Sequence, residues 1–367
     1  MTEAAVDLLV ETMGTAAEEE VSILAEGGRD CDFRRLSKSL RGAAQHLVHD
    51  LVMEVRDSGE TRQQQVNSVA AAVLGPTIAA APVTGIGGTV FAVQVAPTAA
   101  EAEQRAGGLA AWEWEIGLEN LPPRLWLDQR WLDLTGTALE FRDRVVMGPV
   151  DFFRPIVRLR DVLQIWQGLR TVKVGDTTSN RTIARTSTGE LRQIQWAQRC
   201  VQTDAGPRVR GVCRDVADES DPAQMHMDLI EMALIDKLMH LHDKPGDGSP
   251  GVFAAVGDHT YQNAPTIIKW LTPYIPTIGH GVSTGQTPAI HPDTLLKIPG
   301  WLEQSKAGPI TDVGMTRRGG GGWLQVVFHG DILDRELFPT IGVMIVYPGD
   351  VSVADSREPG FAPPQDH

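Results

Sequence analysis

The sequence predicts an α+β fold in which antiparallel sheets are flanked by helices, and three observations support this fold class. The segment AWEWEI at Ala111–Ile116 alternates apolar and acidic residues with a period of two, the pattern of a strand with one buried face. Two turns downstream, each containing glycine, separate further apolar runs as in β-hairpins. Because 367 residues exceed what one core holds, we expect three domains, at residues 1–103, 109–220 and 221–350, followed by a disordered tail at 351–367.

The first hundred residues are predicted to run strand, strand, helix, strand, strand. Short apolar runs at Asp7–Thr12 and Val21–Ala25 predict the first two strands. Apolar residues at helical spacing predict one helix over Phe33–Arg56, which the Asp57-Ser58-Gly59 segment ends. The remaining two strands are predicted at Val66–Ile78 and Gly88–Val95.

The second domain is predicted to begin after a linker. Thr98–Gly108 is small, polar and ends in glycine, which is the composition of a linker. Beyond it the patterns predict a strand at AWEWEI, a short strand and helical turn within Arg124–Gly136, a long helix over Arg158–Val172, and three antiparallel strands at Thr182–Thr186, Leu191–Gln202 and Val209–Val216.

The third domain is predicted to open with a helix from Asp221 to about Asp243. Its apolar residues recur at spacings of three and four and draw one stripe along it, which packs either on the third domain or in a signalling or dimer seam. The strands expected after it are Val252–Val256, Thr266–Leu271, Ile310–Met315, Gly322–His329 and Ile341–Tyr347, with a helix at Pro292–Gln304 interrupted near Pro299.

Composition excludes several classes of partner. The formal charge of −14 argues against nucleic acid and anionic membranes, because both are bound through clustered Lys and Arg. Val66–Ala100 carries no charge and is long enough to span a bilayer, but prolines and glycines interrupt it, so we expect two buried strands there and no membrane span. The acidic N-terminus does not have the pattern of a signal peptide, and three cysteines do not indicate a disulfide framework. A cytoplasmic protein is therefore expected.

Two cysteines lie on neighbouring predicted strands. If the turn between these strands centres on Ala205, Cys200 pairs with Arg210 and Cys213 pairs with Ala197, which places the two thiols on opposite faces. A disulfide is then geometrically excluded, and each cysteine is interpreted as a small buried residue, with a thiol sensor as the alternative.

Several segments resemble a PAS domain. They are AWEWEI, the DFFRP turn at Asp151–Pro155, and the run from Arg185 to Glu219, whose closing pattern comprises Gly211, Arg214, Asp215, Val216, Asp218 and Glu219. GGTVFAVQV at Gly87–Val95 resembles the strands of GAF-like sensors. The whole chain, including LLVETMG at Leu8–Gly14, resembles an actinobacterial, mycobacterial-type family of triple sensor-domain proteins with a central PAS domain. This resemblance implies three tandem sensor-like domains without an effector domain.

Three further motifs could carry chemistry, and each also has a structural explanation. Gly281–Gly285 matches the GxSxG pattern around Ser283, but a strand and a helix are not predicted on either side of it, so a hydrolase is the less favoured reading. His240 and His242 lie two apart on the predicted helix, so they do not chelate together and no metal site is predicted. The glycines after Arg317-Arg318 are interpreted as a hairpin loop.

The aromatic residues of the central domain are the candidate ligand site. They fill a core or line a cavity between sheet and helix, and no residue among them is identifiable as a haem or flavin anchor, so no cofactor is predicted. The residues expected to face this gap are Trp126, Phe152, Phe153, Trp166, Trp196 and Cys200.

We therefore expect a cytoplasmic sensory or regulatory protein, not an enzyme, that binds a small-molecule ligand or a signalling protein through PAS- and GAF-like domains. Whether it forms a homodimer stays open. The alternatives are a scaffold whose domains no longer bind ligands and, less favoured, a hydrolase that uses Ser283.

Overall fold

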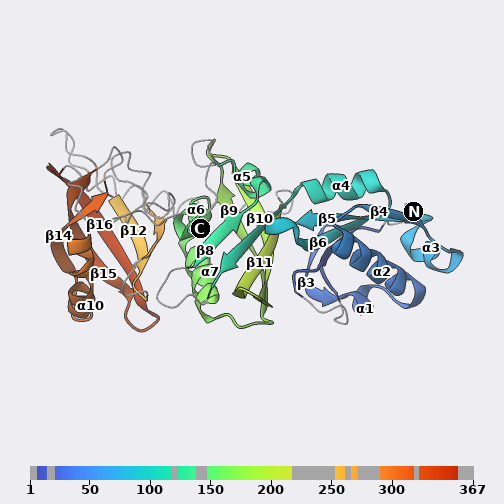
Figure 1. Ribbon diagram of the computed structural model, residues 1–367, viewed down its shortest axis with the longest axis horizontal. Coiled ribbons are helices and arrows are strands. Elements are labelled where there is room, and N and C mark those ends of the chain that lie inside the picture. The colour runs from blue at the N-terminus through green and yellow to red at the C-terminus, as the bar shows by residue number, and fades with distance from the viewer. Residues whose placement is uncertain are drawn as a thin grey trace. The chain divides into compact units, whose positions relative to one another are not determined.

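The structure, a computed structural model, describes residues 6–14, 21–116, 123–137, 147–216, 253–260, 266–271, 290–317 and 322–353, which form three antiparallel sheets with flanking helices (Figure 1). The predicted α+β class with three sheet domains is confirmed. The chain divides into two compact units. The first unit holds the first two sheets, and the second holds the third sheet together with helix α6 (Pro149–Phe153).

The first domain is a six-stranded sheet in the order β3-β2-β1-β6-β5-β4. Its strands are β1 (Leu8–Glu11), β2 (Ser22–Glu26), β3 (Arg29–Arg35), β4 (Arg62–Gln65), β5 (Thr77–Thr84) and β6 (Val90–Ala96). Its helices are α1 (Leu36–Ser39), α2 (Gly42–Ser58), α3 (Ser68–Leu74) and α4 (Ala99–Gly107), with a 3-10 turn at Ile86–Gly88. The buried face of α2, through Val48, Leu51 and Val55, packs in one core with Val10 and Val93 of the sheet.

Two predictions for this domain were wrong. The helix expected over Phe33–Arg56 begins later, because β3 continues to Arg35 and is followed by the short α1 before α2 starts at Gly42. Asp32 and Phe33 take left-handed φ values of 43° and 54° where the pairing of β3 with β2 is irregular, so this strand lacks a regular alternating pattern. The strand expected over Val66–Ile78 is instead the short helix α3 followed by β5. The Asn67 side chain caps α3 by accepting a hydrogen bond from Ala70 N at 3.0 Å.

The predicted linker at Thr98–Gly108 is also wrong, because most of it forms helix α4. Thr98 Oγ1 caps this helix by accepting from Glu101 N at 3.3 Å. Ala102 and Ala106 are buried against β5 and β6, so the small residues that were interpreted as linker composition are the ones that let the helix approach the sheet closely.

The second domain is a five-stranded sheet in the order β8-β7-β11-β10-β9. Its strands are β7 (Leu109–Glu115), β8 (Arg124–Leu127), β9 (Thr177–Arg185), β10 (Leu191–Thr203) and β11 (Gly206–Asp215), and its helices are α5 (Gln129–Leu134) and α7 (Leu159–Thr171). Every strand and helix predicted for this domain is present, with bounds that differ by a few residues.

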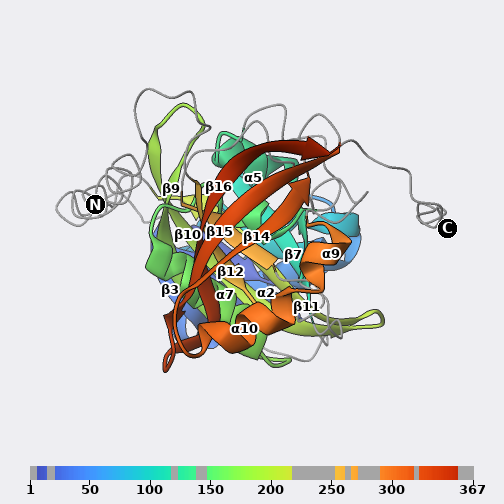
Figure 2. The ribbon, with the colours of Figure 1, turned by 90° about the vertical axis from the view of Figure 1, so that its left-hand side faces the viewer.

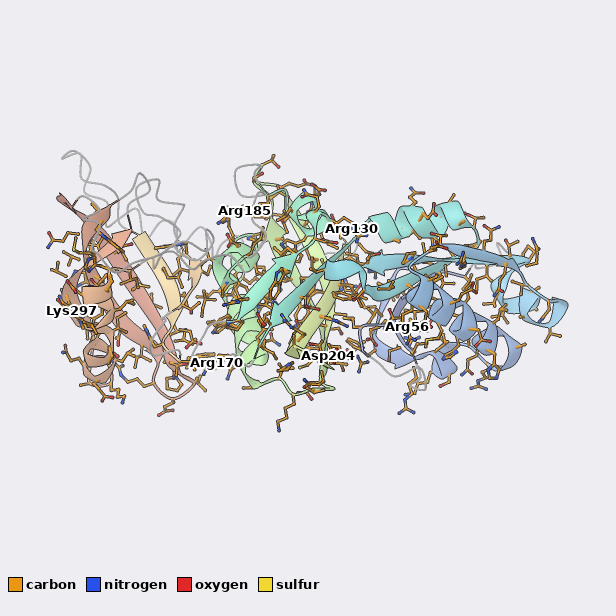
Figure 3. All side chains as sticks on the ribbon, viewed as in Figure 1. Arg56, Arg130, Arg170, Arg185, Asp204 and Lys297 are labelled. Atoms are coloured by element: carbon orange, nitrogen blue, oxygen red, sulfur yellow. The ribbon has the colours of Figure 1, made fainter. Side chains whose placement is uncertain are left out.

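The cysteine register differs by one residue from the prediction. Thr203 pairs with Gly206, so the turn is the two-residue Asp204-Ala205 loop (Asp204 is labelled in Figure 3), and Cys200 pairs with Val209 while Cys213 pairs with Trp196. A one-residue slip moves a side chain to the other face, and the two cysteines therefore lie on the same face, four residues apart along β10. Both are free thiols, and burial raises the pKa of Cys213 well above its usual value.

The third domain repeats the strand order of the second. Its sheet runs β13-β12-β16-β15-β14, so in both sheets the strands of the domain, numbered along the chain, follow the order 2-1-5-4-3. The strands are β12 (Phe253–Asp258), β13 (Thr266–Trp270), β14 (Ile310–Arg317), β15 (Trp323–Asp334) and β16 (Phe338–Val353), and the helices are α9 (Pro292–Leu295) and α10 (Ile298–Ser305). The helix break falls at Leu296-Lys297, and β16 extends three residues into the stretch predicted as a tail.

The first two sheets share an apolar core within the first compact unit. Leu9 and Leu24 of the first sheet lie in one buried cluster with Leu109, Ala197 and Val212 of the second. Two neighbouring sheets are thus held face to face by the hydrophobic effect.

Arginines of the second sheet surround this core with ion pairs. Arg199 binds the buried carboxylate of Glu11 with two hydrogen bonds of 3.0 and 2.9 Å. Arg214 binds Asp30 at 3.0 Å and the Gln195 side chain, and Arg210 donates to Met13 O at 3.1 Å. Arg130, labelled in Figure 3, donates from α5 to Thr84 O at 2.8 Å. The first two domains are therefore joined by a polar rim around an apolar centre.

No helix among the described residues is long and apolar enough to cross a membrane. In the uncharged stretch Val66–Ala100, β5 and β6 form the antiparallel pair that was expected there, with the Gly-rich 3-10 turn between them.

Two glycines of the second domain are expected to respond in opposite ways to alanine. Gly168 lies exposed inside α7 with open space where a Cβ would be, so Gly168→Ala should stabilise by about 0.5–1 kcal/mol. At Gly211 a Cβ would lie 2.3 Å from the buried Trp112 ring, so Gly211→Ala should destabilise by about 1–3 kcal/mol. Denaturant unfolding of both variants measures this, and equal effects would contradict the packing of Trp112 on Gly211.

Candidate functional site

Three of the predicted site residues face one side of the second sheet or lie on the helix that covers it. Thr182 of β9 pairs with Ile194 and donates from Oγ1 to Asp161 of α7 at 2.7 Å, which fixes α7 on this inner face (Figure 1). Trp196 and Cys200 follow Ile194 at even spacing and so share this face. Trp166 belongs to α7 and is almost completely buried.

Large side chains fill the centre of this domain. Trp112 and Trp114 of β7 are 1% and 0% exposed, and Trp112 contacts Trp131 of α5 edge to face with ring centroids 5.4 Å apart. Gly211 lies opposite Trp112 and leaves room for its ring. The ligand site predicted in this domain stays a prediction. The structural explanation for its aromatic residues is that the tryptophans form a packed core.

The other three predicted residues lie elsewhere. Trp126 of β8 is half-buried beneath the guanidinium of Arg208, at 5.0 Å, on the face opposite to that of Trp196. Phe152 and Phe153 lie on α6, edge to face with centroids 5.2 Å apart, and belong to the second compact unit. There, Lys269 of β13 donates to the carbonyl oxygens of Phe153 and Arg154 at 2.8 and 3.3 Å.

The third domain contains an apolar cavity of about 90 Å³ between its sheet and α10. Figure 2 shows α10 lying across this sheet, and α10 contacts β14 and β15. The walls include Ile298, Trp301 and Leu302 of α10 and Phe328, Ile332 and Met344 of the sheet. The cavity thus occupies the gap between sheet and helix that the tryptophans fill in the second domain.

Glycines on the sheet account for this space, because they carry no side chains. Gly257 of β12 pairs with Gly342 of β16, which in turn pairs with Ile332. In the next row Met344 pairs with Gly330. These three glycines lie in two adjacent rows of paired residues and have no side chains to fill the space above the sheet. All three line the cavity. Glycine is unfavourable inside a strand and marks places where a ligand or backbone approaches closely.

Polar contacts hold α10 over the cavity. Trp301 Nε1 donates to Asp312 of β14 at 2.5 Å, and this hydrogen bond lowers the pKa of Asp312. Lys297, labelled in Figure 3, donates to Val313 O at 2.8 Å. Arg335 joins the other end of the helix to β15, because it donates to Ser305 O at 3.0 Å and pairs with Asp331 at 2.7 Å. Helix α10, which covers the cavity, is therefore attached to the sheet at its start, its middle and its end.

Few polar groups face the cavity. Ser305 Oγ donates to Leu302 O at 2.8 Å. His259 lies beside Gly342, and its Nδ1 is buried with no hydrogen-bond partner among the described residues. Burial lowers the pKa of His259, so its imidazole is uncharged at neutral pH. The other titratable side chain in the described walls is Asp331, whose carboxylate is paired with Arg335 at 2.7 Å. The arrangement suits binding of an apolar molecule.

This cavity was not predicted from the sequence. Its wall residues are spread from Gly257 to Met344, and their contacts depend on strand pairing that periodicity does not reveal. The available signal was weak: Gly342 lies inside a predicted strand, and Gly257 and Gly330 directly follow the ends of two others.

Other predicted features lie outside the described residues. They are Ser283 with its glycines, the helix at Asp221–Asp243 with His240 and His242, and Arg318. Within the described part of the chain, no group of three or more His, Cys, Asp or Glu side chains is placed to hold a metal ion.

The first domain matches the model of a known protein family. Residues 7–104, almost the whole of the first sheet domain, fit the family model described as Rv3651-like, N-terminal. The first domain is similar to the N-terminal domain of this Rv3651-like family. No curated protein matches the chain.

Solved structures extend the likeness beyond the Rv3651-like domain. A putative uncharacterized protein from Mycobacterium tuberculosis has a TM-score of 0.67 at 18% identity, over 94% of this chain and 97% of its own. The fold is therefore shared along nearly the entire length. Together with the Rv3651-like match, this confirms the resemblance to a mycobacterial-type family of three-domain proteins.

Two shorter structures match in part. They are a sensory box histidine kinase/response regulator from Burkholderia thailandensis, with a TM-score of 0.24 at 16% identity over 37% of this chain and 95% of its own, and the PAS domain of an HTR-like protein from Haloarcula marismortui, with a TM-score of 0.23 at 11% identity over 32% and 99%.

Proposed function

We propose that this chain is a sensory or regulatory protein that binds a small molecule in the cavity of its third domain. The cavity of about 90 Å³ between sheet and α10 is the observation that carries this proposal. Pockets lined by apolar side chains with few polar groups are the usual form of small-molecule sites. α10 is attached by individual hydrogen bonds, so a ligand beneath it would change contacts that reach the surface at Arg335 and Lys297.

A ligand-free scaffold is the second candidate, and the second domain favours it. Its inner face is occupied by buried tryptophans, and its opposite face is covered by the Rv3651-like domain. In this alternative, the sheets serve as surfaces for protein partners, and the cavity in the third domain has no ligand.

Gly330→Val is expected to weaken ligand binding at least tenfold, because it fills the cavity from its floor. A Cβ at Gly330 meets Ile310 at 3.6 Å and Val343 O at 3.8 Å, which are ordinary contacts, so the backbone does not have to move. Native mass spectrometry of the full chain incubated with small-molecule extract of cells measures the bound species.

Gly300→Ala is the matched control, because Gly300 lies on α10 with open space around it and does not line the cavity. It should bind as the wild type does. Equal capture by Gly330→Val and wild type would place binding elsewhere, and no capture by the wild type would favour the scaffold.

A further inference from the structure

The cavity in the third domain carries information about the chemistry of its ligand. This inference rests on the function proposed above and names the class of molecule. Three properties of the described wall residues limit that class: the volume they enclose, the charge they carry, and the hydrogen-bonding groups they leave unused.

The volume limits the ligand to a few non-hydrogen atoms. A dry apolar protein cavity of about 150 Å³ accepts benzene, and a water molecule takes a share of about 30 Å³ in the liquid. By this scale the cavity of about 90 Å³ holds about three or four carbon or oxygen atoms.

The wall charges exclude an ionised ligand. Among the described residues that line the cavity, Asp331 alone is acidic, and its carboxylate is paired with Arg335 at 2.7 Å. The Arg335 guanidinium is therefore already matched by an anion and also donates to Ser305 O. Burying an ion without a partner is costly, so a carboxylate or an ammonium group is disfavoured in this space.

The unused hydrogen-bonding capacity allows one polar group. Ser305 Oγ and Trp301 Nε1 already donate to protein acceptors, at 2.8 and 2.5 Å. His259 Nδ1 is the buried side-chain atom among the described wall residues that has no partner. A neutral imidazole nitrogen either donates or accepts, according to its tautomer, so a hydroxyl and a carbonyl group are both suitable partners.

We infer that the third domain binds a small uncharged molecule with an apolar body of about three carbon atoms and a single hydroxyl or carbonyl group. The apolar body lies between Trp301, Phe328 and Met344, and the polar group is placed toward His259.

Three probes with one carbon skeleton test this class: 1-propanol, propionate and propylammonium. The full chain is labelled with ¹³C at its methionine methyl groups, and Met344→Leu identifies the Met344 resonance among the ten methionines. 1-Propanol should shift this resonance saturably, and the two ions should bind at least tenfold more weakly. His259→Leu should weaken 1-propanol binding about fivefold, as expected for one lost hydrogen bond, and leave the binding of xenon unchanged.

The outcomes separate this inference from the proposed function. Tighter binding of either ion, or a shift by 1-propanol that does not saturate or that persists in Gly330→Val, overturns the ligand class. If the extract yields a ligand that Gly330→Val loses while 1-propanol fails to bind, the function stands and the class is wrong. If neither binds, both are wrong.

Discussion

Replacing Arg199 with methionine is expected to lower the free energy of unfolding of the first compact unit by about 3–5 kcal/mol, because it leaves a buried carboxylate without its cation. Glu11 is 5% exposed, and Arg199 supplies both hydrogen bonds that link it to the second sheet. The arginine also lies over the Phe33 ring at 5.5 Å, and its stem packs on Gly14. Denaturant unfolding of the full chain measures the loss.

A double variant separates charge from packing. Glu11→Met combined with Arg199→Met removes both ions, and should recover much of the loss, since apolar replacement of a buried pair is often neutral. Lys306→Met is the control: its pair with Glu303 is 65% and 72% exposed, so the change should cost less than about 1 kcal/mol. An Arg199→Met variant as stable as Lys306→Met would refute a buried ion pair between the domains.

Lys269 is expected to make the second compact unit more stable as the pH rises from about 8 to 10.5. Burial, assisted by the Arg154 cation, lowers the pKa of Lys269 from 10.5 to about 8. The folded form then binds fewer protons than the unfolded form between these values, so stability increases with pH in this window. With an allowance for partial solvent screening, the gain is roughly 2–3 kcal/mol.

The measurement compares wild type with Lys269→Met at pH 7 and pH 10. Other groups titrate in both proteins, so the difference between them isolates Lys269. The wild type should gain stability relative to the variant as the pH rises. A difference that does not change with pH would show that Lys269 titrates normally and that its contacts with the α6 carbonyls do not desolvate it.

The elements that the sequence predicted well are those with strong local signals. The alternation in β7 and the turn at Gly189, whose φ is 87°, located the strands of the second domain because each signal lies within a few residues. Helix α2 ends at Gly59 in the left-handed conformation, as its stop segment indicated.

The failures share a dependence on partners distant in sequence. β3 carries few apolar residues and is held by Arg214 and Arg181 of another domain through Asp30, so its own residues do not predict a strand. α4 was interpreted as a linker because its burial comes from β5 and β6. The turn after Thr203 was misjudged by one residue, which reversed the face of Cys213 relative to Cys200.

The cavity of the third domain lies between a sheet and a helix, as does the site predicted in the second domain, which stays a prediction. Because the second domain is rich in tryptophan, its gap between sheet and helix was expected to hold a ligand. The third domain has the same strand order, and glycines line its cavity, whereas buried tryptophans lie on the strands and helices of the second domain. A glycine is a weaker signal in a sequence than a tryptophan.

The shared core of the first two sheets limits how this protein could have evolved and how it can be divided. A gene fragment cut near residue 108 would expose Leu109, Ala197 and Val212 on one side and Leu9 and Leu24 on the other. Each fragment would also carry half of the Glu11–Arg199 pair. A boundary placed between the first two domains would therefore destabilise both parts, and the effects of substitutions at Glu11 of β1 and Arg199 of β10 are coupled across about 190 residues of sequence.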